Sequence, residues 1–356
     1  MPILNRKKMR PDVLKLMDDI FKLQTRGMFK FLKGDKDSGL KFAELWQKLM
    51  KGNEQFFKKE KTIEELSSLI TNEDMNFLAR AFRFAFDFVF EAHQKNNPIL
   101  DNVTVEQVDV NGVPAEWQIV PEVTDDKVIL YFHGGGYILG SPNSHRLFTI
   151  TLGKVTKMRV LSVDYRLGPE YKYPAALEDG VNAYKWLLNS GIKPENIIIS
   201  GDSAGGHLTF ITLIKLRDEG IPFPAGAIAL SPLTDVSLSG QSFFKNAETD
   251  PVLGDIGVFW WGKATAEGIE PSDSRISPVF ADLKGLPPML VQASSSEILY
   301  SDSVRIVENA KSAGVNVTLQ VWDDMPHVFQ QFGLNKLPES KEAIDNIAKF
   351  VEKLIS

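Results

Sequence analysis

A Gly-x-Ser-x-Gly turn at Gly201, Ser203 and Gly205 lies between two apolar segments of different character. Residues 196–200 are short and β-branched, which predicts a buried strand, and residues 208–216 form an apolar run with almost no breaker, which predicts a helix. A strand that turns into a helix so quickly strains the central position and needs small neighbours, which the glycines supply. We therefore expect the Ser203 hydroxyl to stand clear of a sheet. The competing interpretation is a glycine-rich phosphate-binding turn, but that would require a Lys-Ser or Lys-Thr pair, which does not follow.

Strands and helices alternate along most of the chain after residue 127. The predicted strands are 128–132, 160–164, 197–200, 226–230, 289–293 and 315–322, and the predicted helices are 143–157, 174–190, 204–219, 301–313 and 339–355. Residues 103–110 and 114–120 predict a hairpin that turns at Asn111-Gly112. Such alternation predicts an α/β fold with a mainly parallel central sheet flanked by helices. Catalytic groups then lie beyond the carboxyl ends of the strands.

The first part of the chain has a different texture, with a helical pattern and no convincing strand. Residues 1–95 contain 19 Lys and Arg against 14 Asp and Glu, a surplus of five positive charges. Within Met75–Glu91 the phenylalanines alternate as in a strand, but the charged residues recur every three or four positions. We favour a helix buried on most sides, in which the i, i+4 spacing would allow Arg83 and Asp87 to pair.

Two segments are expected to form a helical cap over the catalytic domain at 98–356. One is the N-terminal helical region 1–97, and the other is an insertion at about 234–275 that interrupts the alternation with prolines, glycines and aromatic side chains. An apolar pocket under such a cap would be lined by aromatic residues. The candidates for substrate contact are Tyr137, Phe244, Trp260 and Trp261.

Ser203 requires a general base, because a serine hydroxyl is a weak nucleophile at its ordinary pKa. The five histidines of the chain are at positions 93, 133, 145, 207 and 327. His207 shares a helix with the serine and should point along it, and His133 opens a glycine turn. His327 lies in a loop just after a predicted strand, beyond its carboxyl end, and is the predicted base.

The base in turn needs a carboxylate that holds its tautomer and stabilises the imidazolium. In the chain order serine, acid, histidine, the acid follows the strand 289–293. Glu297 lies in the loop directly after this strand, whereas Asp302 begins the next helix and has a second role there as a helix-start acid. We favour Glu297 and keep Asp302 as the alternative.

Acyl transfer also needs hydrogen-bond donors for a developing oxyanion. The run His133-Gly134-Gly135-Gly136 follows the strand 128–132, and its glycines leave backbone N–H groups unscreened by side chains. Two of these groups can converge with the N–H of Ala204 at the start of the helix after the serine. No His-Glu-x-x-His pattern or acidic cluster is present, so we expect neither a metal nor a cofactor.

Four ordered motifs resemble those of the hormone-sensitive-lipase-like (bacterial family IV) esterases of the α/β-hydrolase fold. They are the runs 133–136 (HGGG), 164–170 (DYRLGPE), 201–206 (GDSAGG) and 326–329 (PHVF). The match covers about residues 98–356. It implies hydrolysis of carboxylic esters under a cap of N-terminal helices and an insertion, with oxyanion donors at Gly135, Gly136 and Ala204.

The chain departs from this family at two places. The acid position reads Glu297-Ile298-Leu299, where the family usually has Asp-Pro-Leu, and residues 1 to about 50 have no counterpart. Because a glutamate is one methylene longer, its loop must retreat slightly. We expect a hydrolase of short to medium acyl esters that works through an acyl-Ser203 intermediate. The alternatives are an amidase or peptidase with the same triad, and a non-catalytic binding protein on a hydrolase fold.

Composition restricts the partners and the compartment. A net charge of −6 and a pI near 5.5 argue against nucleic acid as a partner. The chain has no cysteine, which excludes disulfides, and no apolar run approaches the roughly 20 residues that span a bilayer. We expect a cytoplasmic protein. The basic, phenylalanine-rich N-terminal helices suggest peripheral contact with a membrane or with a second copy of the chain.

Overall fold

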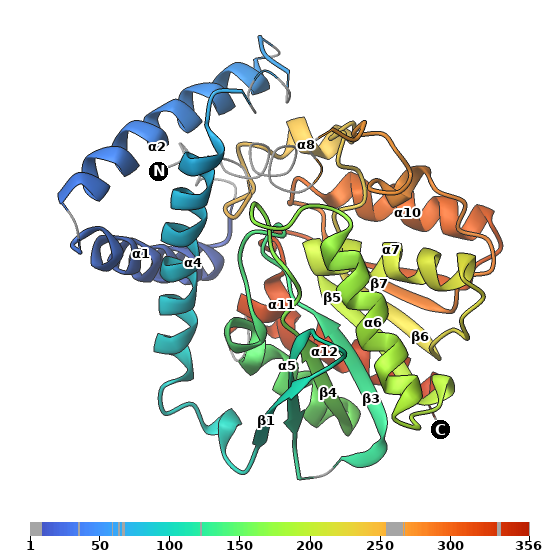
Figure 1. The fold of residues 1–356 in the computed structure, drawn as a ribbon. Coiled ribbons are helices and arrows are strands. Elements are labelled where there is room, and N and C mark those ends of the chain that lie inside the picture. The colour runs from blue at the N-terminus through green and yellow to red at the C-terminus, as the bar shows by residue number, and fades with distance from the viewer. Residues whose placement is uncertain are drawn as a thin grey trace.

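The computed structural model describes residues 9–355 apart from 35, 59, 63–64, 66–67, 122, 254–265, 267 and 333–335. Its centre is an eight-stranded sheet with the order β1-β2-β4-β3-β5-β6-β7-β8 (Figure 1). The strands are β1 (Thr104–Asp109), β2 (Pro114–Ile119), β3 (Thr124–Phe132), β4 (Met158–Val163), β5 (Ile197–Asp202), β6 (Gly226–Leu230), β7 (Met289–Ser294) and β8 (Val317–Trp322). Only β2 pairs antiparallel, with β1 and with β4, among these strands. The mainly parallel α/β sheet is therefore confirmed.

Helices cover both faces of the sheet (Figure 1). The five large ones are α5 (Pro142–Thr156), α6 (Ala175–Asn189), α7 (Ala204–Asp218), α10 (Tyr300–Ser312) and α12 (Pro338–Leu354). In β3, Leu130 and Phe132 face the core under α6, α7 and α10, while Ile129 and Tyr131 face the core under α5 and α12. Side chains of period two thus build two apolar layers from one strand, as expected for a sheet buried on both sides. Short helical turns are η2 (Pro98–Leu100), η3 (Pro194–Asn196), η4 (Pro278–Phe280) and α11 (Phe329–Phe332).

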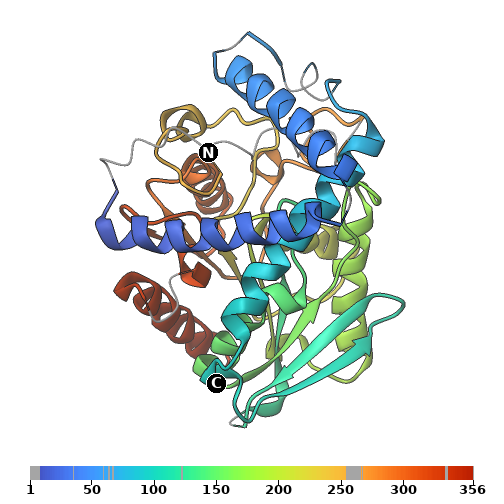
Figure 2. The same ribbon diagram turned by 90° about the vertical axis from the view of Figure 1, so that its left-hand side faces the viewer.

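The N-terminal region forms the long helices α1 (Pro11–Leu32), α2 (Lys36–Phe57) and α4 (Asn72–Gln94). The helix predicted at 75–91 is confirmed, and a capping box between Thr71 and Asp74 starts it. In Figure 2, α1 crosses in front of α4, and buried residues of both helices join an apolar cluster with Met325, beside His327. Within the described ranges, no helix is both long enough and apolar enough to cross a membrane.

The pairing expected inside α4 is wrong, because Arg83 reaches across to the sheet domain instead of to Asp87. Its guanidinium donates to the Glu170 carboxylate at 2.8 and 2.9 Å and to the carbonyls of Ile138 (2.6 Å) and Gly168 (2.7 Å). These acceptors match the fork of N–H donors that an arginine presents, which one carboxylate on the same helix does not. The residue fastens α4 to the segments after β3 and β4.

The insertion contains the short helix α8 (Gln241–Lys245). Leu238 and Phe243 of the insertion share one apolar cluster with Leu45 of α2, Leu78 of α4 and Ile298 beside Glu297. The N-terminal helices and the insertion therefore pack together on the acid-bearing loop. Their joint role as a cap over the substrate stays a prediction.

Candidate active site

The serine turn has the strained geometry that the sequence predicts. β5 ends at Asp202, α7 begins at Ala204, and Ser203 between them has φ +54° and ψ −116°. A Cβ at position 205 would overlap the carbonyl of Phe132 at the end of β3, so β3 and α7 approach this closely only because Gly205 lacks one. Ser203 is buried, with 6% of the residue exposed. Such a turn presents the hydroxyl at the carboxyl edge of the sheet.

His327 and Glu297 lie in contact beyond the ends of β8 and β7. The His327 Nδ1 to Glu297 Oε2 distance is 2.5 Å, and both side chains are buried. Burial alone would lower the pKa of His327, but the hydrogen bond and charge of Glu297, with the charges of Asp250 and Asp202, raise it above its usual value. The other ring nitrogen, Nε2, is buried and has no hydrogen-bond partner among the described residues. It is the nitrogen that remains to accept a proton.

Ser203 and His327 are both attached to the end of β6. The backbone N–H of Ser203 donates to the carbonyl of Leu230 at 2.7 Å, and the N–H of Val328 donates to the Ser231 hydroxyl at 3.3 Å. Two adjacent residues of one strand end thus hold the serine turn and the histidine loop. This attachment brings the two loops to the same edge of the sheet.

Three consecutive serines join the acid loop to the histidine loop. The Ser294 hydroxyl donates to the carbonyl of Met325 (2.6 Å), the Ser295 hydroxyl donates to Asp323 (2.5 Å), and the Ser296 hydroxyl accepts from the N–H of Asp324 (3.1 Å). The N–H of Ser294 also donates to Glu297 Oε1 at 2.9 Å. Both carboxylate oxygens of Glu297 are therefore engaged, which fixes its direction.

The alternative acid, Asp302, lies elsewhere. Its carboxylate accepts from the backbone N–H groups of Thr234 (2.7 Å) and Asp235 (2.9 Å), where the insertion begins. Burial raises the pKa of Asp302 to about 8, with the charge of Asp235 acting in the same direction. The structure thus brings Glu297, and not Asp302, to His327.

The side chain of Asp202 binds the glycine loop that follows β3. The N–H of Gly134 donates to Asp202 Oδ1 at 2.9 Å, and a Cβ at position 134 would overlap that carboxylate. The next two residues have positive φ values, +112° at Gly135 and +61° at Gly136. Their N–H groups have no acceptor in the described part of the chain, and Ala204 is the first residue of α7, so its N–H has no partner within the helix.

Sequence reasoning missed the partners of Asp202. Tyr131 donates to its Oδ1 at 2.6 Å, and His145 Nε2 lies 3.5 Å from its Oδ2. Burial acts to raise the pKa of Asp202, but His145 and Tyr131 hold it below its usual value. A charged residue in the middle of a buried turn requires such partners. The sequence therefore indicates that Asp202 has polar partners but does not indicate which residues they are.

Two residues of the insertion that hold the acid loop were also missed. Asn246 Nδ2 donates to the carbonyls of Ser295 and Glu297, both at 2.9 Å, and Asp250 Oδ2 accepts from the N–H of Ile298 at 2.9 Å. Burial raises the pKa of Asp250. These residues are about fifty positions from the loop they hold, and no spacing in the sequence indicates the contact.

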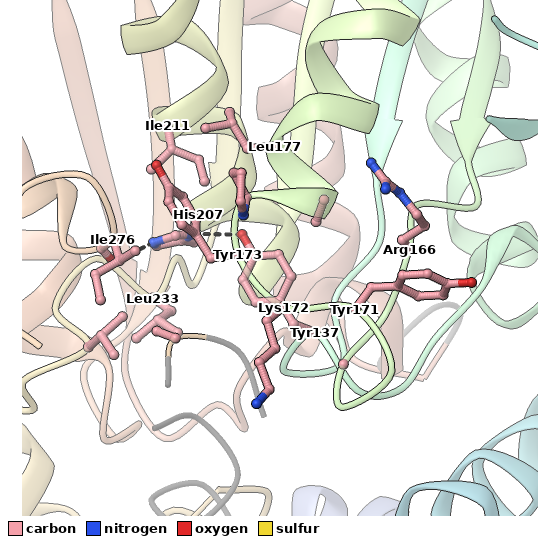
Figure 3. Close-up of a pocket in the computed structure, with 15 residues that line it drawn as sticks. Tyr137, Arg166, Tyr171, Lys172, Tyr173, Leu177, His207, Ile211, Leu233 and Ile276 are labelled. Carbon is pink, nitrogen blue, oxygen red and sulfur yellow. Dashed lines mark hydrogen bonds between the residues drawn. The ribbon is translucent and has the colours of Figure 1, made fainter. Parts of the chain in front are cut away.

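A small cavity lies beside His207 of α7 (Figure 3). Tyr137 lines it, and its hydroxyl lies 2.6 Å from His207 Nδ1. His207 Nε2 lies 2.8 Å from the carbonyl of Ile276. Since a carbonyl only accepts, Nε2 carries the proton and Nδ1 accepts from Tyr137. Burial lowers the pKa of His207 to about 4, which keeps the ring neutral.

The other predicted contact residues are placed differently. Phe244 is 40% exposed on α8 and does not line this cavity. Trp260 and Trp261 lie outside the described residues. A role in substrate binding stays a prediction for all three.

Comparison with known proteins identifies the fold family of the chain. A family model described as alpha/beta hydrolase fold matches residues 129–331. An esterase of Acinetobacter venetianus is 35% identical over 292 residues, covering 81% of this chain and 93% of the relative. An acetyl-hydrolase of Streptomyces hygroscopicus is 38% identical over 244 residues, covering 68% and 81%.

Solved structures point to the same group. One is an esterase of the bacterial hormone-sensitive lipase family, with a TM-score of 0.74 and 38% identity, covering 87% of this chain and 99% of that one. Another is an esterase/lipase from an uncultured bacterium, with a TM-score of 0.72 and 40% identity, covering 78% and 91%. The chain belongs to the hormone-sensitive-lipase-like esterases of the α/β-hydrolase fold.

Proposed function

We propose that this esterase cleaves short to medium acyl esters with Ser203 as nucleophile, His327 as general base and Glu297 as the acid of the triad. The observation that carries the proposal is the 2.5 Å contact between His327 Nδ1 and Glu297 Oε2. It fixes the proton of the imidazole on Nδ1 and leaves Nε2, which has no partner among the described residues, as the acceptor of the serine proton.

In the first half of the reaction, His327 Nε2 takes the Ser203 proton while the serine oxygen attacks the ester carbonyl carbon. The carbonyl oxygen becomes an oxyanion, which accepts hydrogen bonds from the N–H groups of Gly135, Gly136 and Ala204. The imidazolium, stabilised by Glu297, then gives its proton to the departing alkoxide. An alcohol leaves, and the acyl group remains on Ser203.

The second half repeats these roles with water. His327 removes a proton from the water molecule that attacks the acyl carbon, and the same N–H groups bind the second oxyanion. The proton then returns to the Ser203 oxygen as the carboxylic acid is released. No further group is needed for the atoms and charges to balance.

The names of two relatives, esterase and acetyl-hydrolase, favour an ester over an amide as the substrate of this chain. An amidase or peptidase would use the same triad. A binding protein on this fold usually lacks the serine or the base, whereas both residues are present in this chain. Small ester substrates are therefore the proposed partners. A cytoplasmic location, and contact of the N-terminal helices with a membrane or a second copy, are retained as proposals.

The test compares hydrolysis of p-nitrophenyl esters and p-nitroanilides by the wild type and by Ser203→Ala, with labelling by a fluorophosphonate. We expect ester turnover and labelling in the wild type and loss of both in the variant. Faster turnover of anilides than of esters would favour the amidase alternative. An unlabelled wild type would favour the binding protein.

A further inference from the structure

The oxyanion loop (residues 133–139) carries two of the proposed oxyanion donors, and its backbone has an unusual conformation. Gly135, Gly136 and Tyr137 have successive φ values of +112°, +61° and +62°. Glycine adopts such values freely, but a residue with a Cβ does not, so Tyr137 adds strain to the run. A strained backbone persists only where its surroundings hold it. The contacts around this loop therefore determine where the N–H groups of Gly135 and Gly136 point.

The segment 164–170, one of the four family motifs, lies against this loop and has no step in the mechanism so far. The Tyr165 hydroxyl donates to the carbonyl of His133 at 2.6 Å, and the two rings stack with their centroids 4.2 Å apart. The N–H of Gly168 donates to the carbonyl of Tyr137 at 2.8 Å. The motif therefore binds the oxyanion loop both before and after the two donor glycines.

Arg83 binds this motif and the oxyanion loop together. It belongs to α4, which lies alongside the sheet domain (Figure 1). Its Nε donates to the carbonyl of Ile138 at 2.6 Å, and its Nη2 donates to the carbonyl of Gly168 at 2.7 Å. The N–H of Ile138 in turn donates to the carbonyl of Gly135 at 3.1 Å. One guanidinium thus connects the motif to the turn that contains the donors.

Arg83 also forms an ion pair. Both terminal nitrogens of the guanidinium donate to the Glu170 carboxylate, at 2.8 and 2.9 Å, and 38% of the Glu170 side chain is exposed. An ion pair this exposed contributes little to stability. The carbonyl of Ile138, by contrast, belongs to the oxyanion loop itself, and a charged donor makes a stronger hydrogen bond to it than a neutral donor would. The contacts with the two carbonyls are therefore the ones that can affect the reaction.

We propose that Arg83 is a positioning residue for ester hydrolysis. Through the two carbonyls it holds the oxyanion loop in the conformation that aims the N–H groups of Gly135 and Gly136 at the developing oxyanion. A helix of the N-terminal region then contributes to the rate of the chemical step. The motif at 164–170 acquires a role as well, because its Gly168 is the second point at which the guanidinium binds.

This inference rests on the proposed ester hydrolysis at Ser203, and the experiment separates the two. The readouts are kcat and KM for p-nitrophenyl butyrate and Ki for an alkyl trifluoromethyl ketone. The ketone carbon adds the Ser203 oxygen, the serine proton passes to His327, and the ketone oxygen becomes an oxyanion that stays bound. Its Ki therefore reports on the oxyanion site without turnover. Absence of Ser203-dependent hydrolysis in the wild type would refute the proposed function itself.

Two variants of Arg83 test the positioning role. Arg83→Met removes the guanidinium and should lower kcat about 10²-fold, because a displacement of about 1 Å near the reacting atoms costs about this much. We expect KM to stay within about threefold of the wild type and Ki to rise by the same factor as kcat falls. Arg83→Lys keeps the charge but lacks the fork that reaches two carbonyls, and should lower kcat about tenfold. It keeps the test decisive even where Arg83→Met does not fold.

The matched control is Glu170→Gln, which removes the ion pair and leaves both carbonyl acceptors of Arg83 in place. Its kcat, KM and Ki should stay within about threefold of the wild type, and thermal unfolding of each variant measures stability separately. The inference is overturned if both Arg83 variants keep more than about a third of wild-type kcat. A Ki that does not follow kcat would overturn it as well, and so would a loss of kcat in Glu170→Gln as large as that in Arg83→Lys.

Discussion

Replacing Glu297 with Gln tests the assignment of the acid with almost no change in shape. The N–H of Ser294 donates to one carboxylate oxygen, so the amide oxygen of the glutamine must take that place. The amide NH₂ then faces His327 Nδ1 and makes this nitrogen an acceptor. The imidazole proton moves to Nε2, and the ring is unable to take the Ser203 proton.

The size of the effect follows from this trapped tautomer. In Ser-His-Asp enzymes, the equivalent exchange of carboxylate for amide lowers kcat by about 10⁴. Here the carboxylate contact is short and buried, so we expect Glu297→Gln to lower kcat by about 10³–10⁴ with little change in KM. The loss appears mainly in kcat because the imidazolium forms only as the reaction proceeds.

The matched control is Asp302→Asn, which changes the other candidate carboxylate after β7. With a pKa of about 8, Asp302 already carries a proton at neutral pH, and an asparagine oxygen accepts from the same two N–H groups. We expect activity within about threefold of the wild type, as for an exchange of one neutral acceptor for another. The assay is p-nitrophenyl butyrate hydrolysis at neutral pH, with thermal unfolding as the check on folding. The reasoning is refuted if Glu297→Gln keeps more than a tenth of wild-type kcat, or if Asp302→Asn loses a hundredfold.

Three further predictions concern the surroundings of the triad. Gly134→Ala places a Cβ against the Asp202 carboxylate and should lower kcat by about 10²–10³, as loss of one oxyanion donor does; a loss below tenfold would contradict this. The kcat/KM should fall as pH drops through the pKa of His327, which the charges of Glu297, Asp250 and Asp202 raise. Asp250→Asn removes one of these negative charges and should move the acidic limb of the pH profile to lower pH. An acidic limb that does not move would contradict this coupling. Because the pKa of Asp302 is raised to about 8, the folded protein binds the Asp302 proton more tightly than the unfolded chain does. This contribution to the free energy of unfolding is lost as pH rises towards 8. The Tm of Asp302→Asn relative to the wild type should therefore increase between mildly acidic and alkaline pH.

The fold could be predicted from the sequence because its signals are local. Most of the parallel strands are short apolar runs followed by a helix, and the glycines around Ser203 indicate the turn itself. The same holds for the helix at 75–91, since its charges recur with helical period. Arg83 shows the limit of this approach. A residue four positions away is visible in the sequence, whereas Glu170 and two backbone carbonyls on other segments are not.

The candidate site also contains residues with a local sequence signal and residues without one. The positions of Ser203, Glu297 and His327 follow from the ends of strands, and the sheet then brings the acid and the histidine into contact. Asn246 and Asp250, which hold the acid loop, belong to the insertion and reach this loop only in the folded chain. Hydrogen bonds between a side chain and a distant backbone carry no sequence period, so pattern reasoning has no access to them.

Glutamate at the acid position illustrates how these distant contacts matter. A glutamate carboxylate reaches one methylene farther than that of an aspartate, and a longer side chain has more rotamers to lose. The structure restricts it from both ends: Ser294 binds its carboxylate, and Asn246 binds the carbonyl of Glu297 itself. Since Asn246 belongs to the insertion, the segment that we predict to cover the substrate is also the segment that aims the acid. The loop that bears a longer acid is therefore fixed by the sheet domain on one side and by the insertion on the other, and neither alone determines where the His327 imidazole points.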